Sequence, residues 1–358
     1  MLPINDVSFD MIRNGVSSGD VGDKLLQSGM DVGALRPFIG ESGKSYITIN
    51  GKPIPTQNAA TLRKDDWIQL DEAIIRVAKP RLKAVGDLRA RGLTFTIANG
   101  MGTTVLQTEN ISDIDPAIVS MDGLREGKPD RPEFDITNLP LPIIHKDFHF
   151  SLRQLQASRN GGSPLDTSTA ELAARRVAEE AEKMLLGVST VADTFNYAGS
   201  ASTIYGYTDF PSRLTVTLTA PTGAIATDGA AFLNDVMEMM QASRDAYHYG
   251  PWVLYVASAW DQYLDNDFKA TSDKTIRNRV KELEGLEDIR TLDYLSDYDA
   301  ILVQMESSIV REVIGMDMVT LQWDSKGGLQ KNFKIMTIMV PQLRADQNGN
   351  TGIVHGTV

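Results

Sequence analysis

The sequence predicts an α+β protein, and three stretches carry that prediction. Residues 168–186 have the pattern of one long helix, with Gly187 placed to end it. The stretch MVTLQWDSKGGLQKNFKIMTIMVP has two strand-like runs on either side of Gly327-Gly328, which predicts a long hairpin. Residues 88–140 form an extended segment, rich in proline toward its end, with little core of its own.

The composition is that of a globular chain. It has 358 residues, of which 42% are apolar and 23% charged, so it can bury a sizeable core. It has no cysteine, which excludes disulfides and cysteine-based zinc sites. The formal charge of −12 argues against a surface that grips nucleic acid. We find no signal-peptide pattern and no apolar run of membrane-spanning length, so we expect neither secretion by a cleavable signal nor a bilayer protein.

Residues 1–62 are rich in Gly, Ser, Pro and Asp, and they predict an arm that needs a partner surface. Within this arm, GESGKS resembles the end of a phosphate-binding loop. The first glycine of such a loop would stand where this chain has Phe38, and the following YITI alternates like a strand. We therefore reject a nucleotide site and predict a turn, followed by a strand that Asn50-Gly51 closes into a hairpin.

The helices have start and stop signals in the sequence. Asp65 or Asp66 is expected to cap a first helix, which Pro80 ends or kinks. Ser168 and Glu171 form a capping-box pattern for the long helix, whose alanine-rich face lets another backbone approach closely. The apolar residues of the first helix recur at helical spacing: Trp67, Leu70, Ile74, Val77 and Ala78.

Two strand-like runs, LTFTI and TTVLQT, lie on either side of Asn99-Gly100-Met101-Gly102. This arrangement predicts two strands joined by a hairpin turn. The stretch lacks the third glycine of a dinucleotide-binding fingerprint, and no helix follows it, so we expect no cofactor there.

The second half of the chain predicts an α/β unit that begins near Asp228. Its strands are expected in PWVLYVAS and DAILVQM, and a polar helix is expected in TSDKTIRNRVKELEG. A further strand, RLTVTLTA, precedes this unit, and a polar tail is expected at the end of the chain. We expect Met237, Met239 and Met240 to fill the core. One face of the first helix of this unit is expected to carry Phe232, Leu233, Val236, Met240 and Tyr247.

Histidines are the first candidates for chemistry. His145 and His149 are four residues apart in a stretch that looks like a strand, so they share a face and could bind a metal. No third ligand stands nearby in the sequence, which favours a structural role on a half-buried strand. His248 is expected to end a helix and to interact with its last carbonyls.

No pattern in the sequence predicts an enzyme. There is no Gly-x-Ser-x-Gly elbow and no cysteine nucleophile, and the carboxylates of Glu282, Glu284, Glu287 and Asp288 look like a solvated helix end. We assign no catalytic, cofactor-binding or metal-binding residue, and a metal-dependent enzyme using His145 and His149 is kept only as a competing interpretation.

The stretch LPLPIIHKDFHFSLRQLQASRNGGSPLDTSTAELAARRVAEEAEKMLLG resembles the encapsulin and tailed-bacteriophage major capsid group. The shared elements are KDDWIQLDEAIIRVAKPRLKAVGDLRARG, WVLYVASAWDQYLD, AILVQM, MVTLQWD and FKIMTIMVPQL. The resemblance spans about 62 to 358 and is most specific at 147 to 187. It implies the Hong Kong 97 fold, divided into an N-terminal arm (1–62), a helix leading into the E-loop (63–87), the E-loop (88–140), a P-domain (141–225) with spine helix 168–186, an A-domain (226–311), and return strands with a C-terminal tail (312–358).

The function that this resemblance implies is that of a major capsid protein. Copies would form hexamers and pentamers of an icosahedral phage shell in the bacterial cytoplasm and enclose double-stranded DNA in the virion. Scaffold, portal and decoration proteins would be further partners. In that arrangement YITI would be free to pair with an adjacent edge strand, and Lys128, which we cannot match to a crosslinking motif, lies in the E-loop.

The alternative is an encapsulin shell that packages a cargo enzyme. Encapsulins resemble this chain from about the Trp67 helix onward, whereas here about 60 residues come first. That N-terminal region is the feature that separates the two interpretations.

Overall fold

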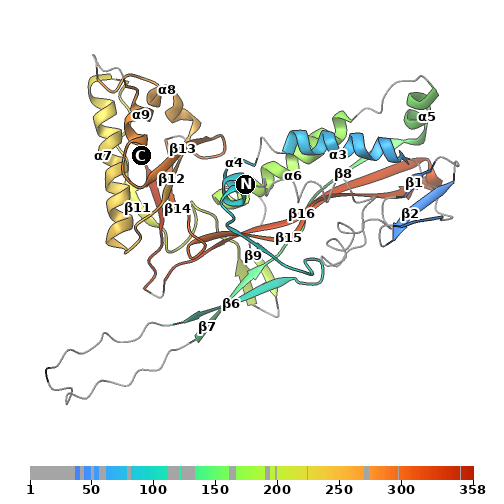
Figure 1. Cartoon of the computed structure of the whole chain (residues 1–358), viewed down its shortest axis with the longest axis horizontal. Helices are drawn as coiled ribbons and strands as arrows, with labels where there is room; N and C mark the ends of the chain where they lie inside the picture. The colour runs from blue at the N-terminus through green and yellow to red at the C-terminus, as the bar shows by residue number, and fades with distance from the viewer. Residues whose placement is uncertain are drawn as a thin grey trace.

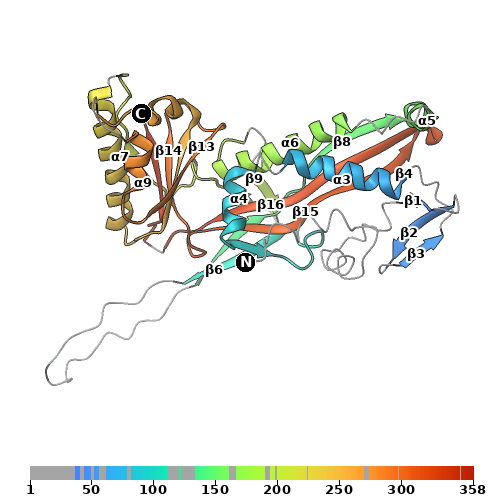
Figure 2. The same ribbon diagram turned by 45° about the horizontal axis from the view of Figure 1, so that its top comes forward.

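The computed structural model describes residues 37–358, with gaps at 41–43, 50–51, 56–61, 79–81, 112–120, 122–133, 161–166, 190–193, 198–199, 224, 270–273, 297 and 347. The described chain is elongated, with a five-stranded lobe at one end and a long hairpin lobe running to the other (Figure 1). A two-stranded ribbon projects from the region where the lobes meet (Figure 2).

The long lobe is built on the predicted hairpin. Strands β15 (Val310–Ser325) and β16 (Gln330–Leu343) pair from end to end, apart from two register shifts between Ile314 and Val319, with the short helix η3 (Lys326–Gly328) at the turn. Gly327 and Gly328 both have positive φ, 65° and 86°, which glycine adopts without strain. Strands β5 (Thr94–Thr96) and β8 (Ile144–Ser151) complete the sheet in the order β5-β15-β16-β8.

Helices α3 (Lys64–Ala78), α5 (Leu152–Asn160) and α6 (Ser168–Leu186) belong to this lobe. Trp67, Phe148, Phe150 and Phe333 are buried between α3 and the sheet, with ring centroids 5.3–5.9 Å apart. Packing aromatic rings edge-to-face and offset stabilises such a core beyond the area that it buries.

The long helix α6 has its predicted bounds, and Gly187 ends it with φ 79°. Its predicted cap is wrong, because Thr167 rather than Ser168 is the N-cap residue, and its side chain makes no capping hydrogen bond. Thr167 instead donates its hydroxyl proton to the Glu171 carboxylate at 3.1 Å. Helix α3 begins at Lys64, so Asp66 lies inside its first turn, where the macrodipole favours a negative charge.

The five-stranded lobe has the strand order β11-β17-β14-β12-β13. Its strands are β11 (Leu214–Thr217), β12 (Trp252–Ala257), β13 (Leu286–Leu292), β14 (Ala300–Gln304) and β17 (Ile353–Thr357). Helices α7 (Ile225–Asp245) and α9 (Ile276–Lys281) pack on this sheet, with η2 (Ser258–Trp260) and α8 (Asp261–Leu264) at one end (Figure 1).

Two sequence predictions about this lobe are wrong. The end of the chain is not a polar tail, because β17 is buried and lies between β11 and β14. Tyr247 does not lie on the apolar face of the helix, because it follows the helix end with φ 65° and its side chain is 76% exposed. The other four residues of that face are buried as predicted.

The projecting ribbon consists of β6 (Val105–Ile111) and β7 (Phe134–Pro140), paired from Val105 with Pro140 to Ile111 with Phe134. The predicted hairpin between LTFTI and TTVLQT is wrong, because β5 pairs in parallel with β15 instead. Gly100 explains the difference: a Cβ atom there would lie 2.0 Å from the Gly315 carbonyl oxygen, so the loop after β5 packs directly on the long hairpin. Only part of residues 88–140 therefore extends from the body.

The start of the described chain is a small sheet with the order β3-β2-β1-β4. Its strands are β1 (Phe38–Ile39), β2 (Ser45–Ile49), β3 (Lys52–Pro55) and β4 (Leu62–Arg63). The hairpin predicted at Asn50-Gly51 is confirmed by the pairing of Ile49 with Lys52, while residues 41–43 of GESGKS lie outside the described residues. Of the two edges of YITI, β3 occupies one over its whole length, whereas β1 pairs on the other edge only with Ser45 and Tyr46. The prediction that YITI pairs with a neighbour therefore stays a prediction, limited to that second edge. A further two-stranded sheet joins β9 (Thr194–Tyr197) and β10 (Ser200–Thr203).

Candidate functional site

The predicted histidines do not come together with other ligands. His145 and His149 lie on strand β8 as predicted, but both are exposed rather than half-buried. Within the described residues, no three His, Cys, Asp or Glu side chains form a possible metal site. The metal-dependent enzyme therefore has no third ligand in this part of the chain.

His248 follows the end of α7 and contacts a carbonyl of the last turn as predicted, through its backbone. Its backbone N–H donates to the Ser243 carbonyl at 2.9 Å, and its Nε2 atom is buried without a hydrogen-bond partner. The predicted methionine core is confirmed for Met239 and Met240, whereas Met237 is 41% exposed.

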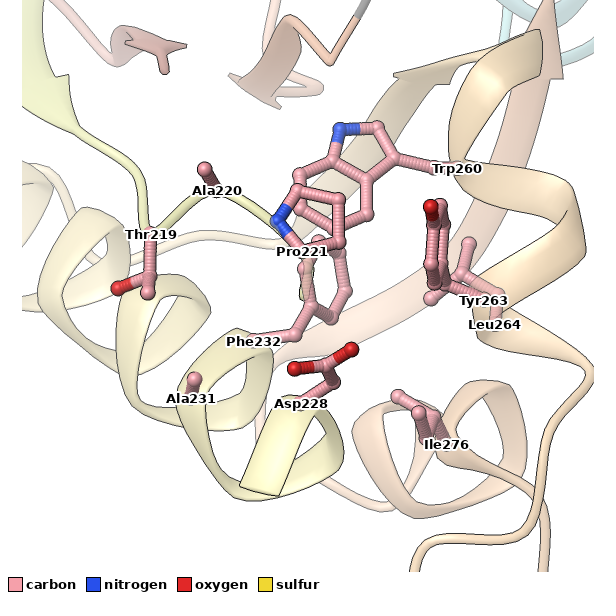
Figure 3. A pocket seen from close by; sticks show the side chains of 10 residues that line it. All are labelled: Thr219, Ala220, Pro221, Asp228, Ala231, Phe232, Trp260, Tyr263, Leu264 and Ile276. Carbon is pink, nitrogen blue, oxygen red and sulfur yellow. The ribbon is translucent and has the colours of Figure 1, made fainter. Parts of the chain in front are cut away.

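A hollow in the five-stranded lobe lies between α7, α8 and α9 (Figure 3). Phe232, Trp260, Tyr263 and Ile276 line it together with Asp228. Its volume of about 10 Å³ is close to the minimum that one water molecule needs. The Asp228 carboxylate is already used, because it accepts hydrogen bonds from the backbone N–H groups of Thr222 and Gly223. This hollow is part of the packing and has no room for a substrate.

Four buried charged side chains, Asp87, Arg89, Glu182 and Glu312, gather around helix α4 (Lys83–Ala90), which lies between the two lobes. The residue at its N-cap position, Leu82, supplies no side-chain cap. Glu182 of α6 replaces that cap, accepting hydrogen bonds from the backbone N–H groups of Ala84 at 2.6 Å and Val85 at 3.2 Å. Burial raises the pKa of Glu182 to about 7, against the lowering effect of these two hydrogen bonds.

The other end of α4 is joined to the long hairpin by an ion pair. Arg89 donates from Nε and Nη2 to the two carboxylate oxygens of Glu312, at 2.8 and 3.1 Å, and its Nη1 lies 3.4 Å from Asp317. The side chains of Arg89 and Glu312 are 8% and 3% exposed. Burial alone would lower the pKa of Arg89, but the two carboxylates outweigh it and raise that pKa. Such a paired, fork-shaped contact fixes orientation as well as distance.

The five-stranded lobe contacts α4 on another side. Tyr255 of β12 donates its hydroxyl proton to Asp87 at 3.1 Å, and Arg290 of β13 lies 3.4 Å from the same carboxylate. Exposed ion pairs flank this contact, between Lys83 and Asp293 and between Arg91 and Glu287. Helix α4, with Glu182, Glu312, Asp317, Tyr255 and Arg290, is called the α4 junction below. It connects the long helix α6, the long hairpin and the five-stranded sheet through directional contacts.

Sequence reasoning missed the α4 junction. One signal was available, since Glu182 interrupts the apolar stripe of the long helix. A carboxylate on a buried face needs partners, so that position could have been marked. Glu287, predicted to be in a solvated helix end, is instead the start of β13 and an ion-pair partner of Arg91.

Comparison with known proteins places the chain in a family. Residues 57–356 match the family described as "Family of unknown function (DUF6260)". The chain belongs to this family. A curated relative, the type 1 encapsulin shell protein EncA of Myxococcus xanthus (strain DK1622), is 26% identical over 273 residues, which cover 72% of this chain and 82% of the relative.

Solved structures identify the fold of this family member. The virus-like particle protein from Pyrococcus furiosus aligns with a TM-score of 0.55 and 17% identity, over 80% of this chain and 97% of that one. The capsid of Myoviridae phage XM1 aligns at 0.54 with 7% identity, over 71% and 86%. The capsid of a native GTA particle aligns at 0.51 with 11% identity, over 74% and 88%. The chain therefore has the Hong Kong 97-type capsid fold that the sequence resemblance implied. Among the described residues, no helix is long and apolar enough to cross a membrane.

Proposed function

We propose that this chain is the major capsid protein of a tailed bacteriophage, and that many copies form an icosahedral shell around double-stranded DNA. The observation that carries the proposal is the elongated fold itself, with a ribbon, β6–β7, that extends beyond the body of its own subunit (Figure 1). A ribbon paired only with itself gains stability from a neighbouring surface, and stable contacts of this kind bury more than about 1,000 Å².

The domain names of the capsid fold then apply as follows. Residues 1–62 are the arm, 63–87 the helix into the E-loop, 88–140 the E-loop, 141–225 the P-domain with spine helix 168–186, 226–311 the A-domain, and 312–358 the return segment. Membership of β11 and β17 in the five-stranded sheet supports assigning both strands to the A-domain as well. In this scheme the α4 junction sets the angle between P-domain and A-domain.

Two features support a phage shell. The alignment with the Pyrococcus furiosus particle protein covers 97% of that protein but only 80% of this chain. This chain therefore has segments that the particle protein lacks. Three of the four N-terminal strands, β1 to β3, precede the stretch that matches the family. The net charge of −12 also suits a container that confines DNA without adhering to it.

The second candidate is an encapsulin shell around a cargo enzyme, and the relation to EncA favours it. Both candidates predict closed particles, so the contents decide between them. Particles purified from the native source and treated with nuclease are expected to hold protected double-stranded DNA. A stoichiometric protein cargo in place of DNA would establish the encapsulin function.

Electron microscopy of the purified chain tests the shared part of both proposals. Closed particles of uniform diameter are expected. A monomer at every concentration that is tested, with and without the other capsid components, would refute both.

Maturation of the shell is proposed to tilt the lobes about the α4 junction. The spine helix and the base of the projecting ribbon would move with it. Identical subunit shapes in empty precursor and filled particles would contradict this motion.

A further inference from the structure

A groove lies at the base of the projecting ribbon. It is bounded by β6 and β7, by β10 with the loop that follows it, and by the end of β16, and its volume is about 580 Å³. Ile136 and Tyr205 line the groove, and their side chains are 57% and 37% exposed, although both are large and apolar. The groove is thus large enough for a segment of another chain and has apolar contacts to offer it.

Two arginines give the groove its charge. Arg344 lines it, and Arg311 stands beside it, donating from Nε to the Gln342 side-chain oxygen at 2.5 Å. The guanidinium of Arg311 also lies 4.4 Å from the centre of the Phe95 ring. Both arginines are half-buried, and neither forms an ion pair within the described part of the chain.

The positive charges of Arg311 and Arg344 also repel each other. Burial lowers the pKa of Arg344, and burial together with the charge of Arg344 lowers that of Arg311. Asp346 is the acidic residue among those that line the groove, but its carboxylate accepts hydrogen bonds from the backbone N–H and side chain of Asn350. Arg344 and Arg311 together outweigh the charge of Asp346 by one, which leaves a single positive charge that an incoming carboxylate would neutralise.

We propose that this groove is a docking surface for a second copy of the chain, which inserts a carboxylate-bearing segment against Arg344 and Arg311. A second copy is the proposed occupant because its net charge of −12, from 47 acidic and 35 basic residues, is opposite in sign to that of the two arginines. The groove is also continuous with the ribbon that extends from the subunit (Figure 2). This proposal rests on the shell function proposed above and names one contact within it.

Zero-length crosslinking tests the contact. In the variant Arg344→Lys the charge is kept and an amine is introduced, which a carbodiimide joins to a carboxylate in direct contact. The matched control is Arg153→Lys, at an exposed position on α5. Denaturing gels separate links between copies, which give dimer bands, from links within one copy, which migrate as monomer. Mass spectrometry of the bands then identifies the joined peptides.

We expect a dimer band containing the residue-344 peptide in the Arg344→Lys variant, beyond the bands of the wild type and the control. Monomer-only links at position 344, or no link there, would overturn the proposal. A segment of the same copy, or an anion such as nucleic acid, would then be the occupant.

Charge reversal provides a second readout. Arg344→Glu is expected to weaken self-association by roughly tenfold or more, because like charges would then face each other, whereas Arg153→Glu leaves it near the wild-type value. Equal effects of the two variants would count against the groove. Closed particles without the crosslink would disprove the groove contact alone, while a crosslink between copies without closed particles would disprove the shell alone.

Discussion

The variant Glu182→Gln tests the α4 junction, because it removes a buried charge and keeps the shape of the side chain. Burial raises the pKa of Glu182 from 4.5 to about 7 in the folded chain. One unit of pKa difference corresponds to about 1.4 kcal/mol. The fold with Glu182 ionised is therefore less stable than the fold with Glu182 protonated by roughly 3 kcal/mol.

The sign of the pH dependence follows from which state binds the proton more tightly. Between about pH 4.5 and 7 the folded chain holds a proton on Glu182 that the unfolded chain has released. The stabilisation that this proton provides is complete below about pH 4.5 and is lost as the pH rises through about 7. The wild type therefore loses stability over this window relative to Glu182→Gln, which has no such group.

Urea unfolding of the two proteins at intervals from pH 4.5 to 9 measures this difference, with fluorescence from the buried Trp67 and Trp252 as the signal. The variant is expected to gain roughly 3 kcal/mol on the wild type between the two ends of the range. Taking the difference cancels the titration of carboxylates that do not interact with Glu182; Asp87 and Glu312 do interact with it. Glu180→Gln, which removes a charge from the same helix at a half-buried position, supplies the baseline.

The opposite trend would refute the reasoning. If Glu182→Gln became less stable than the wild type as the pH rose, the two N–H bonds to the charged carboxylate would outweigh its burial. Glu182 would then stabilise α4 as an anion rather than tolerate its charge.

Three further variants test the packing around α4 and the long hairpin by urea unfolding. Arg89→Met leaves Glu312 buried without its main partner and is expected to lower the free energy of unfolding by about 3–5 kcal/mol. The double variant Arg89→Met with Glu312→Leu is expected to recover most of this loss. If the double variant recovers none of it, the pairing is contradicted. Gly86→Ala is expected to stabilise α4 by up to about 1 kcal/mol, since no heavy atom lies within 4 Å of an added Cβ, and a loss would point to a contact there. Gly100→Ala is expected to destabilise the chain because its Cβ would meet the Gly315 carbonyl oxygen, and a wild-type midpoint would rule out that close contact.

Local sequence signals predicted the elements whose stability is local. The long helix α6 follows from its apolar period and from Gly187, and the β15–β16 hairpin follows from two long apolar runs around a glycine pair. Strand β17 was missed because its burial depends on β11 and β14, which come from distant parts of the sequence. A short run after a polar loop carries no sign of such partners.

The α4 junction was beyond prediction for the same reason. Arg89 and Glu312 are 223 residues apart, so their pairing exists only once the hairpin has folded back along α4. Glu182 was the exception, since a carboxylate within an apolar stripe is visible in the sequence. Its partners, the first N–H groups of another helix, were not.

The guanidinium groups of Arg89 and Arg344 are both partly or fully buried, but only that of Arg89 is paired with carboxylates of the described chain. Arg89 has Glu312 and Asp317 within 3.4 Å, so the fold itself supplies the compensating charge. Arg344 is half-buried beside a second arginine and forms no ion pair in the described chain. Burial of a cation without a partner costs free energy. The chain has more carboxylates than basic groups, 47 against 35, so another copy can supply a carboxylate as the partner. The difference between the two sites is therefore best explained by a carboxylate that reaches Arg344 from outside the subunit.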